Sequence, residues 1–126
     1  MIHFARYGAA WLAVTTLLAT ASPARAQDGF RLLGEKEIRA RVVGKDITDG
    51  PHWAMYLRPD GALVSSESGS SRIGRWKIGN NRLCLTHQSG DAPTCNEVWV
   101  SGSNIRLREN RDQKTFDAVI MTHQTN

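Results

Sequence analysis

Two cysteines are the residues of this chain whose type and spacing most directly suggest chemistry. Cys84 and Cys95 lie in the stretch RLCLTHQSGDAPTCNEVWV, each inside a run typical of a β-strand. Two antiparallel strands joined by a loop would oppose them with Cα atoms about 4.5–5.5 Å apart, a separation that a disulfide can bridge. The same register places Arg82 opposite Glu97, an opposite-charge pair. The spacing favours a disulfide; the alternatives are a metal clip and a redox pair, for which close C-x-x-C or H-x-x-x-H motifs are typical.

The other titratable residues form no motif of a known reaction. His87 lies three residues from Cys84, so strand geometry places the two side chains on opposite faces. His52 and His123 have no partner at a metal-ligand spacing, and motifs for a nucleophile elbow, a phosphate loop, a zinc protease or a calcium loop are absent. We therefore expect no catalytic residues, no metal and no cofactor, and no enzyme activity. An enzyme would require a cleft in which two titratable side chains with shifted pKa values converge.

Three aromatic residues are the candidate ligand contacts. Trp53 opens a predicted strand and is expected at the mouth of a barrel, where an aromatic side chain often meets a ligand. We predict that Tyr56 points inward from the same strand; in the alternative register Leu57 and Leu63 point inward. Trp99 falls on the face opposite the apolar one and predicts a contact surface. The alternative for Trp99 is packing over the disulfide or under a helix.

The start of the chain has the three parts of a secretory signal. Arg6 supplies the positive charge, Ala9 to Ala21 forms an apolar run of thirteen residues, and Ala24-Arg25-Ala26 matches a cleavage site before Gln27. The run is shorter than the roughly 20 residues of a membrane span. Residues 1–26 are therefore predicted to be a cleaved signal peptide; a retained N-terminal anchor is the alternative.

Cleavage would leave residues 27–126, a single β domain in the periplasm or outside the cell, with no stable membrane span. Removing Arg6 and Arg25 lowers the formal charge from +4 to +2. So small a charge spread over one domain does not indicate a nucleic-acid partner.

One short helix and a series of strands must position these side chains. Glutamates open the segment 34–44 and arginines follow, and Ile38 and Val42 share one face, so a helix is predicted there. From Lys45 the apolar residues recur with period two between turn signals. Eight strands are predicted, over Lys45–Thr48, Trp53–Arg58, Ala62–Ser66, Arg72–Ile78, Arg82–His87, Cys95–Val100, Asn104–Glu109 and Thr115–Thr122.

The predicted fold is mostly β, an antiparallel up-and-down meander of about eight strands that forms a small calycin-like barrel or a curled sheet. A turn at Asn80-Asn81 pairs Ile78 with Leu83, and the next hairpin pairs Val100 with Ile105. In these registers and in the register of the cysteine pairing, the apolar side chains all lie on the same face of the sheet. The polar segment 65–71 is interpreted as a loop; the alternative is a rim that contacts ligand.

Several of these residues also form a pattern shared with other proteins: Tyr56, Asp60-Gly61, Gly74-Arg75-Trp76, Leu83-Cys84 and Cys95. With it the chain resembles small exported proteobacterial β-domain proteins of unknown function, which carry a Gly-x-Trp … Leu-Cys … Cys pattern. The resemblance covers about 70 residues. It implies a periplasmic β domain and brings no catalytic residue.

The sequence thus predicts an exported barrel that binds a small amphipathic ligand or an envelope partner protein. Such a binding barrel is expected to have a cavity near Trp53 and Tyr56. The alternative is an envelope structural or inhibitor-type interaction module with a filled core, and with an exposed patch around Trp99.

Overall fold

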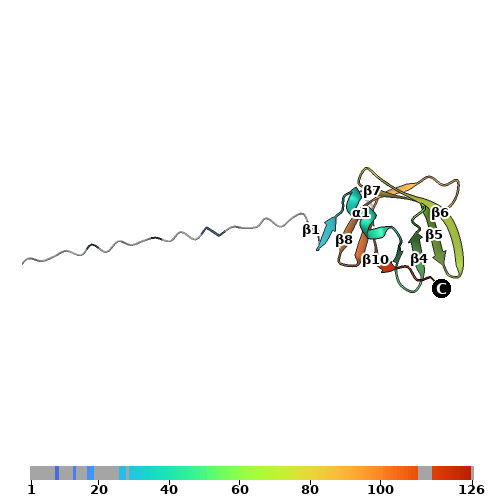
Figure 1. The fold of residues 1–126 in the computed structure, drawn as a ribbon, viewed down its shortest axis with the longest axis horizontal. Helices are drawn as coiled ribbons and strands as arrows, with labels where there is room; N and C mark the ends of the chain where they lie inside the picture. Colours follow the sequence, from blue (N-terminus) through green and yellow to red (C-terminus); the bar gives the residue numbers. More distant parts are fainter. Residues whose placement is uncertain are drawn as a thin grey trace, which may run out of the picture.

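The computed structural model describes residues 26–27, 29–110 and 115–125, and four isolated positions, 8, 13, 17 and 18. The predicted signal peptide therefore lies almost wholly outside the described residues, as does part of the segment before the last strand. Within the described part, eight strands form a closed antiparallel barrel accompanied by one helix (Figure 1). The barrel strands are β3 (Lys45–Thr48), β4 (Trp53–Leu57), β5 (Ala62–Glu67), β6 (Ser70–Gly79), β7 (Arg82–Thr86), β8 (Thr94–Ser101), β9 (Asn104–Arg108) and β10 (Phe116–Thr122).

The strands follow one another around the barrel in chain order, and β10 pairs with β3 to close it. This arrangement confirms the predicted up-and-down meander and selects the barrel over the open curled sheet. The turn at Asn80-Asn81 has positive φ at both positions, 52° and 57°, which suits a two-residue hairpin between twisted strands. As predicted, Ile78 pairs with Leu83 across it. Closure leaves no long exposed strand edge in the barrel.

The segment 65–71 is not a loop, so that interpretation was wrong. Strands β5 and β6 extend to Glu67 and Ser70 and are joined by Ser68-Gly69, whose φ values of 48° and 80° again make a tight hairpin. Serine-rich sequence here forms paired strands because its backbone groups complete the β5–β6 ladder.

Helix α1 (Glu35–Val42) covers one end of the barrel and buries Ile38 and Val42 completely. The backbone N–H of Glu35 donates a 3.0 Å hydrogen bond to Asn81 in the β6–β7 turn. Arg41 donates to the carbonyl of Gly102 in the β8–β9 turn. The helix is thus held over the turns at this end, as expected for a helix too short to be stable alone.

A small hairpin precedes the helix and was not predicted. It consists of β1 (Ala26–Gln27) and β2 (Phe30–Leu32), and the predicted cleavage boundary after Ala26 falls within β1. Strand β2 pairs with the second half of β8, opposing Leu32 to Trp99, whereas β7 pairs with the first half. Strands β7 and β2 therefore pair with successive parts of the same edge of β8.

Alternation in β4 and β5 places Leu57 and Leu63 in the core, each with 0% exposure. The prediction that Tyr56 points inward was therefore wrong. Tyr56 lies between the buried residues Met55 and Leu57 and faces the outside, paired with Val64 on the next strand. The core is filled mainly by aliphatic side chains from all strands.

The two cysteines are joined as predicted. Cys84 of β7 opposes Cys95 of β8, and the sulfur atoms are 2.01 Å apart. The expected cross-strand charge pair is also present, with 3.9 Å between Arg82 Nη2 and Glu97 Oε1. The disulfide fixes the register between the two strands on the outer side of the barrel.

Candidate functional site

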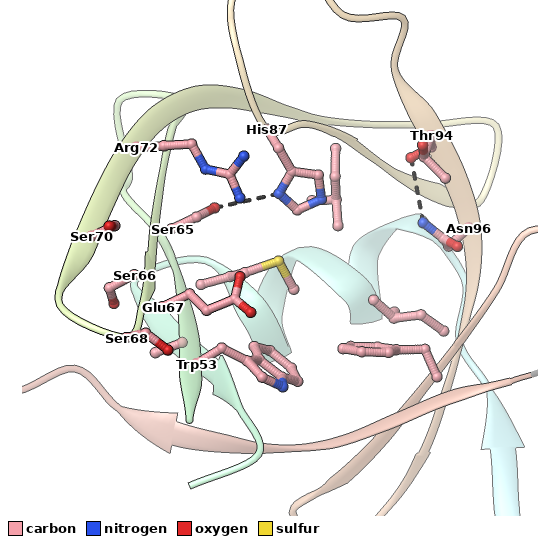
Figure 2. Close-up of a pocket in the computed structure, with 15 residues that line it drawn as sticks. Trp53, Ser65, Ser66, Glu67, Ser68, Ser70, Arg72, His87, Thr94 and Asn96 are labelled. Carbon is pink, nitrogen blue, oxygen red and sulfur yellow. Dashed lines mark hydrogen bonds between the residues drawn. The ribbon is translucent and has the colours of Figure 1, made fainter. Parts of the chain in front are cut away.

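A cavity of about 890 Å³ lies in the barrel at the end opposite α1 (Figure 2). Its lining comes from the first residues of β4, β6, β8 and β10 and from the last residues of β5, β7 and β9, so it occupies the end from which the longer loops project. The volume falls in the range of roughly 300–1,000 Å³ typical of small-molecule sites.

The barrel is hollow at this end because the inward side chains of β5 and β6 become small or polar toward it. On β5 the inward positions run from Leu63, which is fully buried, to Ser65 and Glu67. On β6 the residues paired with these are Gly74, Arg72 and Ser70. Leucine fills the helix end, whereas serine and solvated charged groups leave volume unfilled at the other end.

One wall of the cavity is apolar and aromatic. The rings of Trp53 on β4 and Phe116 on β10 are 4.8 Å apart between centroids and tilted by 36°. Phe116 is 42% exposed, and Met55, Leu85 and Leu107 continue the wall inward. An aromatic pair left partly exposed at a mouth offers an apolar surface to a ligand.

The position of Trp53 is fixed by the loop before it. Its backbone N–H donates a 3.0 Å hydrogen bond to Asp49 Oδ1, and its carbonyl accepts one of 2.5 Å from Thr48 Oγ1. Desolvation raises the pKa of Asp49, but hydrogen bonds from the backbone N–H groups of Trp53 and His52 and from the His52 side chain outweigh it and hold that pKa below its usual range. Asp49 is therefore a stable anion that organises the mouth loop.

The facing wall is polar and comes from β5, β6 and the end of β7. Ser65 Oγ and His87 Nδ1 are 3.4 Å apart, and the Arg72 side chain extends beside them (Figure 2). Gly74 makes this approach possible, since a Cβ atom there would lie 1.8 Å from the carbonyl oxygen of Thr86. Three hydrogen-bonding side chains thus converge on one part of the cavity.

Asn96 is a buried polar residue on this otherwise apolar face, with 8% exposure. Its Nδ2 donates a 3.3 Å hydrogen bond to the carbonyl of Thr94, and both residues line the cavity. Asn96 pairs with the fully buried Leu83 across the β7–β8 ladder, so its side chain points into the barrel. Asn96 belongs to the polar lining.

The three sequence-predicted ligand residues do not lie together. Trp53 lines the cavity. Tyr56 lies outside it and stacks on His123, with ring centroids 3.5 Å apart. Trp99 is half-buried on the outer surface, and its neighbour on the next strand is Leu32 of the unpredicted hairpin.

Ser65 and Glu67 belong to the segment whose alternative interpretation was a rim that contacts ligand. Arg72, His87 and Phe116 also line the cavity and were not assigned to a site. The signal for Ser65, Glu67 and Arg72 is period-two alternation, which continues from Leu63 through the serine-rich segment. Phe116 was assigned to the apolar face but not to a site.

Comparison with known proteins finds no matching family model, curated protein or solved structure. In the part of the chain that the structure describes, no group of three or more His, Cys, Asp or Glu residues is arranged to hold a metal ion. The described helix is not long and apolar enough to cross a membrane. The interpretation of the site therefore rests on its own geometry.

Proposed function

We propose that this protein is an exported β barrel that binds a small amphipathic ligand in the cavity, without transforming it. The observation that carries the proposal is the pairing of an aromatic wall, built on Trp53 and Phe116, with a polar wall across the same cavity. A ligand with one apolar and one polar part satisfies both walls at once.

The alternative of an interaction module with a filled core receives less support. That alternative predicted no cavity, whereas the barrel has a cavity of about 890 Å³ at its open end. It also predicted an exposed patch around Trp99, and that side chain is half-buried against neighbouring strands.

A catalytic role is not part of the proposal. Ser65 and His87 resemble a nucleophile and a base, but their contact of 3.4 Å is long. Among the described residues, no carboxylate hydrogen-bonds to His87 to orient its ring. The pair serves better as hydrogen-bonding groups for a bound ligand.

Export is proposed from the sequence features at the N-terminus, with cleavage between Ala26 and Gln27 and a location in the periplasm or outside the cell. The Cys84–Cys95 disulfide supports this, because such bonds persist in oxidising compartments.

The test is binding of N-phenyl-1-naphthylamine, an uncharged probe that fluoresces in apolar sites. We expect saturable binding by the native protein, and weakening by about tenfold in Trp53→Ala, because the variant loses an aromatic contact. Trp99→Ala is the matched control, since it removes the same side chain outside the cavity; circular dichroism checks that both variants fold. Equal binding by Trp53→Ala and the native protein would reject this site.

A further inference from the structure

Arg72 is an exposed cation in the lining of the cavity. It pairs with Ser65 across the β5–β6 ladder, on the row that also includes Met55 of β4. The ion pairs of the described residues include neither Arg72 nor Glu67. A guanidinium group has five N–H donors in a planar fork that matches a carboxylate.

Two further polar groups converge with Arg72. The Ser65 hydroxyl and the His87 imidazole, 3.4 Å from each other, lie beside the guanidinium group in Figure 2. When the Nδ1–H of His87 donates to Ser65 Oγ, the hydroxyl proton of Ser65 is free to donate to a bound oxyanion. Arg72 and Ser65 can therefore both donate to a small oxyanion, while His87 holds the hydroxyl group in place.

Glu67 is the competing charge in the lining, and the hairpin register places it nearer the turn. Glu67 pairs with Trp53 and Ser70 on the row next to the Ser68-Gly69 turn, whereas Arg72 lies one inward row deeper. Both side chains are exposed, so burial does not distinguish the two charges. The Arg72 site has the Ser65 hydroxyl as an additional donor, and this favours recognition of an anionic group there.

We infer that the ligand is an anionic amphiphile whose carboxylate binds Arg72 and the Ser65 hydroxyl that His87 orients, and whose apolar part lies against Trp53 and Phe116. This inference rests on the proposed function and specifies the class of ligand. The carboxylate forms a charge-assisted, two-pronged hydrogen bond with the guanidinium group. The apolar chain covers the aromatic pair at the mouth.

The experiment compares three ligands with the same ten-carbon chain: decanoate, 1-decanol and decyltrimethylammonium. Each is titrated against the purified protein loaded with N-phenyl-1-naphthylamine, and displacement gives its affinity. We expect decanoate to bind at least about tenfold more tightly than decanol, as a charge-assisted bidentate contact predicts. Arg72→Gln should remove that preference by weakening the binding of decanoate much more than that of decanol.

Arg75→Gln is the matched control, because Arg75 is on the same strand but exposed on the outer face. It should keep the preference for decanoate. Glu67→Gln should increase decanoate affinity by removing a like charge from the rim.

Equal affinities of the native protein for decanoate and decanol would overturn the inference while leaving the proposed function intact. Tighter binding of the cation would also overturn it, and would make Glu67 the anchor. If the uncharged probe itself does not bind, both the proposed function and the inference fail.

Discussion

At the scale of single residues, the absence of a side chain at position 74 shapes the cavity wall. Gly74 lies where β6 passes from its pairing with β5 to its pairing with β7, and the backbone of Thr86 and His87 approaches it closely. This approach brings His87 within 3.4 Å of Ser65. The glycine is required by this close contact between backbones and not by an unusual φ angle.

Gly74→Ala should therefore destabilise the protein by about 3 kcal/mol, the upper part of the range for overpacking, because the new Cβ atom would lie 1.8 Å from the carbonyl oxygen of Thr86. Urea unfolding followed by circular dichroism measures the change. Gly79→Ala is the control: position 79 is on the same strand, and nothing lies within 4 Å of its Cβ position. Equal stability of the two variants would contradict the described approach of β6 and β7.

At the scale of elements, the registers that the sequence predicted correctly are those in which one face is apolar and the other polar. On the two strands that carry Ile78 and Leu83, apolar and polar residues alternate clearly, so the buried face is defined. A tight turn between the strands sets their pairing. In β4 and β5 both faces are apolar, so Tyr56 and Leu57 were equally plausible inward residues. Only closure of the barrel, which the local pattern does not contain, decides between them.

Two other elements escaped prediction for different physical reasons. The inward residues of 65–72 face a cavity and are polar, so their composition resembles that of a loop. Strands β1 and β2 have two and three residues, too few to show alternation. Strand β2 pairs with β8, and β1 pairs with β2.

The disulfide stabilises the pairing of β7 with β8, and its removal should lower the free energy of unfolding. Cys84 and Cys95 are separated by 11 positions, and closing so short a loop contributes roughly 3 kcal/mol in the chain-entropy model. We expect Cys84→Ala/Cys95→Ala to lose about this amount in urea unfolding. The native protein treated with reductant provides an independent comparison. An unchanged unfolding midpoint in the double variant would contradict the assigned role of the disulfide.

At the scale of the whole molecule, the two ends of the barrel differ. Helix α1 and large aliphatic side chains fill one end, and small or polar inward side chains leave the other end open. The sequence predicted a barrel but left open whether it was hollow, because the unfilled volume depends on side chains from seven strands, β4 to β10, together. The asymmetry is what makes the fold suitable for holding a ligand.

The central claim is that this open end binds an amphiphile, and the most direct measurement is a two-dimensional ¹H–¹⁵N NMR titration of the protein with decanoate. Binding in the cavity should cause saturable chemical-shift changes of the Trp53 indole N–H and of the backbone amides of Ser65 and His87. The signal of the Trp99 indole on the outer surface should stay unchanged. Shifts confined to Trp99 and its neighbours, or no saturable shifts, would contradict binding in the cavity.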